Sequence, residues 1–418
     1  MTIKAGSSSP LIDIESLGFD AGAHLLVRHA LDALRPGERL RVIGASPGWD
    51  VMLAHWCRAQ GHLLQWQTNN DGADGADNDR RRYALVERDS RYGRDGRWRD
   101  AQQSGHSDPR APDAVLPRAS PGWGLAARGA QVEAGSPPYA FRLDRKEEVW
   151  AENAGELYAQ AVAAQWNPDE AIDWSVEFEL PAPVEAAVVQ IMTYMVENEN
   201  AALIVPARFL GQLHPHYREL QAALAIQVAD EARHIEVFTR RIRHKGHEPA
   251  LSTAGGQASL KTLLDEADFS VASFLLSVMG EGTFVALLQF LQAHGPDPLT
   301  RQIARLAARD EARHVALGMS HLLYRLKSEP HLRTRLARAI EARHGALAGT
   351  AGLNEEVFDA LILVAAGELT PAAVARGYAR VQDLMREMAD GRYTRLVRLG
   401  FEAAEARELA SLHTRNFM

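Results

Sequence analysis

The hydrophobic pattern divides the chain into a short mixed N-terminal part and a long helical C-terminal part. Between residues 10 and 68, short apolar runs alternate with two segments of helical spacing, Ala23–Ala33 and Trp49–Ala59, which predicts a small α/β domain. From residue 145 onward, apolar residues recur at the spacing of helices packed against a core. Long helices are predicted near 184–213, 217–245, 258–293 and 298–328, preceded by a helix over 145–165 and followed by shorter helices to residue 414.

The stretch between these parts, residues 69–144, is rich in Gly, Asp, Asn, Arg and Pro and carries little apolar periodicity. We predict a flexible linker here. Tyr83–Glu87 nevertheless has a strand pattern and would pair with His62–Gln67, which would extend the first domain (residues 1–68) to about residue 90. Residues 145–418 form the predicted helical domain. Four long helices suffice for a ferritin-type bundle, so the predicted fold is mainly α, with extra C-terminal helices.

One stretch, Phe269–Leu291, is long enough to cross a bilayer and has a single charged residue, Glu281. Polar helices follow it at once, and the neighbouring helix patterns need it as a core partner. We therefore interpret it as a buried helix and expect no membrane association.

Charge and cysteine content narrow the possible functions. The net charge of −8 gives no support to nucleic-acid binding. The only cysteine, Cys57, excludes an internal disulfide framework and a cysteine-ligated iron–sulfur cluster. Together with the missing signal-peptide pattern at the N-terminus, this predicts a cytoplasmic protein. Cys57 lies on an apolar helix face beside Trp56, so we predict a packing role and no catalytic cysteine.

A pentapeptide, Asp-Glu-Ala-Arg-His, occurs at 230–234 and again at 310–314. In each copy the Glu and His are three residues apart and share one face of the predicted helix, so both side chains can reach one metal ion. Two such helices, with a Glu from each of two others, form a di-iron or di-manganese carboxylate site in four-helix bundles. The predicted ligands from the pentapeptides are Glu231, His234, Glu311 and His314.

Two further glutamates must come from the other helices. Glu281 is the only charge in its apolar helix and lies 30 residues before Glu311, a separation that suits a helix–turn–helix return. A metal partner would offset the high cost of burying this carboxylate. For the first pentapeptide, two glutamates are candidates: Glu199 and Glu197 lie 32 and 34 residues before Glu231. They point about 200° apart on a helix, so only one can face the site. We favour Glu199, whose apolar side continues through Ala201 and Ala202, and keep Glu197 as the alternative.

The remaining charges of the pentapeptides also have predicted roles. Histidines that bind metals usually donate their second N–H to a carboxylate or carbonyl. We expect Asp230 and Asp310 to orient the histidines, with Arg233 and Arg313 completing a buried charge network. A third Glu-Ala-Arg-His, at 341–344, follows Ile340 instead of Asp and has no lone upstream Glu of its own. We interpret it as helix surface.

A glutamate, about thirty residues and then Asp-Glu-x-Arg-His, with the unit repeated, resembles the di-iron carboxylate proteins over residues 184–325. The form of the motif is most similar to their monooxygenase branch. The resemblance implies Glu199, Glu231, His234, Glu281, Glu311 and His314 as ligands. The arylamine N-oxygenases in this group add a third histidine one turn before the last motif, where this chain has Ala307.

These observations predict an O2-activating oxidase or oxygenase that acts on a small organic substrate with two Fe ions, Mn/Fe remaining open. Apolar residues near Glu281 would exclude water from the pocket: Phe274, Val278, Val285 and Leu288. Because the chain has no flavin or nicotinamide fingerprint, we expect an external electron donor or reductase as partner, and we leave a homodimer open. The alternative from another class is a metal-binding sensor or scaffold without catalysis.

The α/β domain resembles the TusA/SirA-like sulfur carriers, through Ala30–Gly44 and the later Gly-His-Leu-Leu at 61–64. That family has a nucleophilic cysteine and a proline at the start of its first helix. The matching positions here are Phe19 and Asp20, so the nucleophile is missing. The resemblance leaves a link to sulfur metabolism open, while docking, oligomerisation or small-ligand binding is the expected role.

Overall fold

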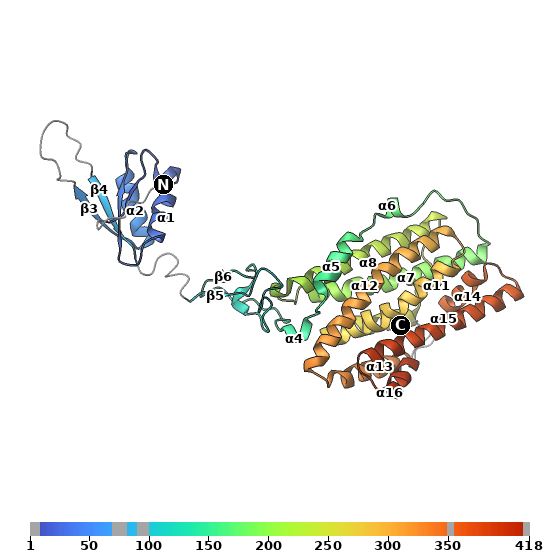
Figure 1. Ribbon diagram of the computed structural model, residues 1–418. Coiled ribbons are helices and arrows are strands. Elements are labelled where there is room, and N and C mark those ends of the chain that lie inside the picture. Colours follow the sequence, from blue (N-terminus) through green and yellow to red (C-terminus); the bar gives the residue numbers. More distant parts are fainter. Residues whose placement is uncertain (1–8, 69–81, 90–99, 349–354, 413–418) are drawn as a thin grey trace. The chain divides into compact units, whose positions relative to one another are not determined.

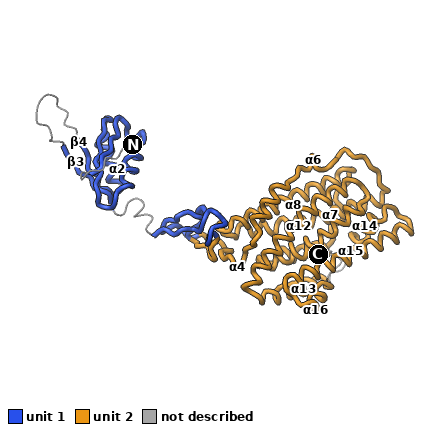
Figure 2. Tube along the Cα trace, in the orientation of Figure 1, with its two compact units in different colours: residues 1–114, 122–138 blue, residues 115–121, 139–418 orange. Residues whose placement is uncertain are grey.

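A computed structural model describes residues 9–68, 82–89, 100–348 and 355–412. The chain forms two compact units, shown in different colours in Figure 2. Residues up to 114 and residues 122–138 belong to unit 1, whereas residues 115–121 and those from 139 onward belong to unit 2.

Unit 1 contains the small α/β fold that the sequence predicts. Its elements are β1 (Leu11–Asp13), η1 (Phe19–Ala21), α1 (Ala23–Asp32), β2 (Arg39–Ile43), α2 (Trp49–Gln60), β3 (Leu63–Thr68) and β4 (Arg82–Glu87). The sheet order is β1-β2-β4-β3, with β1 parallel to β2 and the other pairs antiparallel. The predicted pairing of Tyr83–Glu87 with the strand before it is confirmed, since Trp66 lies opposite Ala84.

The core of this α/β fold lies between the sheet and its two helices. Leu40 and Val42 alternate with exposed or half-buried neighbours along β2, as expected for a strand buried on one face. Cys57 on α2 is 1% exposed, and burial raises its pKa to about 12, which keeps the thiol protonated and inert. The predicted packing role of Cys57 is confirmed.

Part of the predicted linker lies outside the described residues, namely 69–81 and 90–99. The described remainder has defined short elements, β5 (Gln102–Gln103) paired with β6 (Gln131–Val132), and the helical turn η2 (Pro121–Trp123). At its C-terminal end, Leu143 forms a bridge with Leu213 and Arg118 forms one with Arg145, all within unit 2.

Unit 2 is built around helices that run alongside one another (Figure 1). The long helices are α7 (Ala182–Leu210), α8 (Arg218–His244) and α12 (Pro298–Ser328), and α11 (Gly282–His294) packs on α12. A further long helix, α15 (Pro371–Arg398), follows near the C-terminal end. Shorter helical segments precede, separate and follow the long helices: α4 (Lys146–Val149), α5 (Ala154–Ala163), α6 (Pro168–Ala171), η3 (Pro215–Tyr217), α13 (Leu332–Ala348), α14 (Glu355–Ala366) and α16 (Ala403–Ser411). The predicted mainly helical bundle with extra C-terminal helices is confirmed.

The single helix predicted over 145–165 is wrong. The chain leaves helical geometry between α4 and α5, where Trp150 is extended. The carbonyl of Trp150 thereby lies 3.1 Å from Nδ1 of the buried His321, a contact that a continuous helix would prevent.

The single helix predicted over 258–293 is also wrong. The chain forms α9 (Ala254–Asp265), breaks at 266–268 and resumes as α10 (Phe269–Ser273), a π-helix η4 (Phe274–Glu281) and α11. Asp268 causes the new start, since its side chain accepts hydrogen bonds from the backbone N–H groups of Ser270 and Val271. π-helical turns occur frequently at functional sites, and this one ends at Glu281.

Within the described residues, the segment Phe269–His294 is long and apolar enough to span a membrane. Its most apolar window is 78% buried inside the protein, as in the core helix that we predicted. Glu355–Ala366 and Pro371–Arg398 pass the same test only as a pair, and they are bent by 115° at their junction.

Candidate metal centre

The structure brings six side chains from four helical segments together in unit 2. They are Glu199 on α7, Glu231 and His234 on α8, Glu281 at the end of η4, and Glu311 and His314 on α12. All six are buried, with at most 4% exposure. Their ligand atoms form two groups, each within 4.8 Å, and both groups contain Glu231 and Glu311. A pair of carboxylates that belongs to both ligand groups is typical of a centre with two metal ions.

Both imidazoles present Nδ1 to the shared carboxylates. Nδ1 of His234 lies 3.1 Å from Glu231 Oε2 and 3.3 Å from Glu311 Oε1. Nδ1 of His314 lies 3.0 Å from Glu231 Oε1 and 3.3 Å from Glu311 Oε2. The two histidines therefore flank the glutamate pair almost symmetrically, each on the side of its own group.

Glu199, not Glu197, lies at this cluster. Glu199 is 1% exposed, and its Oε1 is 3.5 Å from Nδ1 of His234. Glu197 is half-buried and belongs to neither group. Since the two residues point about 200° apart on α7, the helix that buries one turns the other away.

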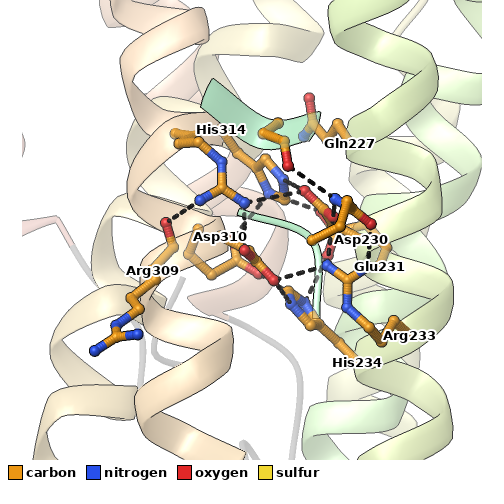
Figure 3. Close-up of polar contacts among 12 residues, drawn as sticks. Gln227, Asp230, Glu231, Arg233, His234, Arg309, Asp310 and His314 are labelled. Carbon is orange, nitrogen blue, oxygen red and sulfur yellow. Dashed lines mark hydrogen bonds and ion pairs between the residues drawn. The ribbon is translucent and has the colours of Figure 1, made fainter. Parts of the chain in front are cut away.

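The aspartates of the two pentapeptides cross over to the opposite histidines (Figure 3). Asp310 Oδ2 is 3.2 Å from Nε2 of His234, and Asp230 Oδ2 is 3.3 Å from Nε2 of His314. In this arrangement each imidazole donates Nε2–H to an aspartate, so that Nδ1 would be the atom available to a metal ion.

The two arginines join the crossed aspartates into one network. Arg233 Nη2 contacts Asp230 and also lies 2.9 Å from Asp310 Oδ2. Arg313 Nη2 contacts Asp310 and lies 3.5 Å from Asp230 Oδ2. Both guanidinium groups therefore offset the buried negative charge of the aspartate pair.

Three contacts at the site come from residues that our sequence analysis did not assign to it. Gln227 Nε2 donates to Glu281 Oε1 at 3.0 Å, Gln165 Nε2 donates to Asp230 Oδ1 at 2.8 Å, and Trp166 Nε1 donates to Asp310 Oδ2 at 2.8 Å. Gln227 could have been assigned to the site from the sequence, because it lies one turn before Glu231 on the same helix face. Gln165 and Trp166 follow α5 in a loop, so no periodic pattern places them.

Burial and mutual repulsion control the charges of the cluster. Burial, reinforced by the neighbouring carboxylates, raises the pKa values of Glu199 and Glu281. Burial alone would lower the pKa values of His234 and His314, but contacts with the surrounding carboxylates raise both above their ordinary range. For Glu231, the two imidazoles outweigh burial and lower the pKa. The raised pKa values of Glu199 and Glu281 indicate that four buried negative charges are disfavoured here unless a further cation is present.

Buried carboxylate oxygens support a cationic occupant. The Oε1 atoms of Glu199, Glu231 and Glu311 are buried and accept no hydrogen bond within the described chain. Their polar neighbours are the imidazole Nδ1 atoms, which are themselves metal-ligand atoms. Four carboxylates and two imidazoles in such a cluster fit a pair of transition-metal ions.

The other predicted residues fall into two sets. Of the expected pocket residues, Phe274, Val278 and Leu288 are buried, whereas Val285 is half-buried. The third Glu-Ala-Arg-His belongs to neither metal group. The predicted helix surface is confirmed for Glu341, which is exposed, but is wrong for Arg343 and His344, which are half-buried and line a cavity.

No protein-family model and no curated protein matches the chain. Similar solved structures include protein 19 with aldehyde deformylating oxidase activity from Synechococcus, at 17% identity and a TM-score of 0.41, covering 57% of this chain and 98% of that one. An R2-like ligand-binding oxidase from Sulfolobus acidocaldarius has 16% identity, a TM-score of 0.40 and coverage of 56% and 89%. A mutant R2-like ligand-binding oxidase with an Mn/Fe cofactor has 18% identity, a TM-score of 0.44 and coverage of 64% and 95%. At these identities and TM-scores, the likenesses identify no family.

Proposed function

We propose that unit 2 is a di-iron oxidase or oxygenase that acts on a small organic substrate. The observation that carries this proposal is the pair of ligand groups sharing Glu231 and Glu311. Glu199 and His234 would complete one metal site, and Glu281 and His314 the other. An Mn/Fe pair fits the same donor set. Bound iron would supply the electrons for the reduction of O2.

The chain's own residues would prepare the site for this chemistry. Asp310 and Asp230 hold the imidazoles in the orientation that directs Nδ1 inward. Gln227 donates a hydrogen bond to one oxygen of Glu281, which would be one of the side chains that hold the metal ions. Phe274 and Val278, both fully buried near Glu281, would exclude water.

Metal analysis of the purified protein tests this function. We expect about two transition-metal ions per chain, lost in Glu231→Ala and Glu311→Ala, and rapid O2 consumption by the reduced iron form with a substrate. Less than one ion per unmutated chain would end the proposal. Two bound ions with only one slow oxidation event would instead favour a metal-binding sensor or scaffold.

The α/β fold of unit 1 would serve docking, oligomerisation or small-ligand binding. Its resemblance to TusA/SirA-like domains stays a proposal, supported by two helices over a four-stranded sheet. Sulfur transfer is disfavoured, because Phe19 and Asp20 occupy the positions of the nucleophile and Cys57 is buried. Deletion of residues 1–68 followed by assay of the remainder tests this part. Unaffected catalysis would exclude direct chemical involvement and leave docking.

Multi-turnover catalysis would need an external electron donor or reductase as partner, and a homodimer is compatible with the proposal. We expect a cytoplasmic location without nucleic-acid or membrane partners, in view of the net charge of −8 and the buried apolar segment at 269–294.

A further inference from the structure

A second polar site lies in unit 2, in a small cavity between η4, α13, α15 and the end of α16. Apolar walls come from Leu275, Met279 and Leu347, and cationic groups come from Arg343, His344 and Arg392. The volume of the cavity is about 30 Å³, enough for a group of a few polar atoms. Arg343 and His344 belong to the third Glu-Ala-Arg-His, the copy that the metal centre does not use.

Two guanidinium groups, those of Arg343 and Arg392, line this cavity, and neither forms an ion pair with a carboxylate among the described residues. Arg392 is only 3% exposed, and its Nε and Nη2 atoms have no hydrogen-bond partner among the described residues. The same is true of Nη1 of Arg343, and also of Nε and Nη2 of Arg395, which lies near Arg392 but does not line the cavity. Arg343 donates once, from Nη2 to Ser259 Oγ at 3.0 Å, and that acceptor is neutral.

These groups remain charged at neutral pH. Burial lowers the pKa values of Arg343, Arg392 and Arg395 to about 10, and proximity of Arg395 contributes for Arg392. Burying an unpaired cation is costly, and clustering several adds like-charge repulsion. An anion in the cavity would offset both costs. Guanidinium groups bind phosphate oxygens through paired N–H donors, and a dianion matches this charge better than a monocarboxylate does.

We propose that this cavity binds the phosphate group of a small molecule, either free phosphate or a monoester with an apolar group. The charge and the number of free N–H donors carry the phosphate assignment, and the apolar walls favour the monoester. This proposal does not depend on the occupant of the metal centre.

The site also lies against the helix that carries Glu281. Leu275 and Met279 are part of η4, which ends at Glu281. Arg395 of α15 packs on the next residue, Gly282, so closely that a Cβ added there would lie 2.5 Å from its guanidinium carbon. A bound phosphate group would therefore be held on the segment that presents one of the six clustered side chains.

Calorimetric titration of the full-length protein with inorganic phosphate, phenyl phosphate and acetate tests the proposal. We expect one saturable phosphate or phenyl phosphate site per chain and at least ten-fold weaker binding of acetate. Tighter binding of phenyl phosphate than of phosphate would assign a monoester, and the reverse order would assign free phosphate. Equal binding of all three would overturn the proposal.

Arginine variants provide the control. Arg392→Met should weaken phosphate binding at least ten-fold and, without phosphate, raise the thermal midpoint, because it removes an unpaired buried cation. Arg386→Met, on the same helix but exposed and paired with Asp383, should change neither value. Arg343→Met serves as a second variant if Arg392→Met does not fold. Unchanged binding in a folded variant of either buried arginine would overturn the proposal, and metal content measured in parallel separates this result from a failure of the metal centre.

Discussion

Asp310 and His234 belong to different copies of the repeated pentapeptide, yet Asp310 Oδ2 lies 3.2 Å from His234 Nε2. Asp230 and His314 form the reciprocal contact at 3.3 Å. The histidine of each ligand group is thus oriented by an aspartate from the opposite helix. A shift of α8 relative to α12 would therefore turn both imidazoles. The repeat therefore has a structural reason beyond doubling the number of ligands.

The crossed contact predicts that Asp310→Asn weakens metal binding although Asp310 is not itself in either ligand group. An amide in place of the carboxylate removes the negative charge that holds Nε2–H, and a loss of about 10- to 100-fold in metal affinity is expected. Competition with a chelator measures it. Asp383→Asn, an exposed change on α15, is the matched control. Equal affinity in Asp310→Asn and the unmutated protein would contradict the prediction.

The two candidate glutamates on α7 give a paired test. Glu199→Gln should reduce the metal content from about two ions per chain toward one, because it removes a ligand oxygen from the group that contains His234. Glu197→Gln should leave the metal content unchanged, since Glu197 is half-buried outside both groups. Elemental analysis after equal loading compares them, and the opposite order would assign the ligand to Glu197.

The six clustered residues could be predicted from the sequence because each is marked by a pattern within its own helix. Glu231 and His234 share a helix face by their spacing, and Glu281 is the lone charge of an apolar segment. The pairing of each Asp with the opposite His depends on how α8 and α12 face each other, which no local pattern records. The contact of Trp166 with Asp310 depends on a loop, for the same reason.

The missed break before η4 has a different cause. Asp268 is a good helix N-cap and was visible in the sequence, but the continuous apolar run after it favoured one long helix. The buried arginine cluster was unpredictable because its members come from two helices, α13 and α15, whose sequences look like ordinary charged surface. Only tertiary packing buries Arg392.

Close packing between α12 and η4 predicts that Gly318→Ala destabilises unit 2. A Cβ at this position would lie 2.8 Å from Ser277 Cβ and 3.3 Å from Val278 Cγ2, so η4 must move. We expect a loss of about 1–3 kcal/mol in the free energy of unfolding in urea, as for other overpacked cores. Gly345→Ala, on α13 with open space around it, should instead gain about 0.5–1 kcal/mol. Similar effects of the two variants would contradict this account.

Buried His321 predicts a loss of stability in mild acid. Its Nε2 lies 2.7 Å from Ser270 Oγ, which accepts a hydrogen bond from Arg325, and its Nδ1 faces the Trp150 carbonyl. Burial lowers its pKa from 6.5 to about 4, helped by the charge of Arg325. The unfolded chain therefore takes up this proton below pH 6.5 while the folded chain resists it. The contribution is fully present above pH 6.5 and is lost as the pH falls toward 4, by about 2 kcal/mol at pH 5.

The measurement is the free energy of unfolding of the protein and of His321→Asn, compared between pH 7 and pH 5. The advantage of the unmutated protein over the variant should shrink by about 2 kcal/mol, because Asn does not titrate. His331→Asn, at an exposed position of the same unit, should follow the unmutated protein at both pH values. A parallel pH dependence of the unmutated protein and His321→Asn would mean that His321 is protonated as readily in the folded chain as in the unfolded one. That result would contradict the assignment of a neutral imidazole to His321 between Ser270 and Trp150.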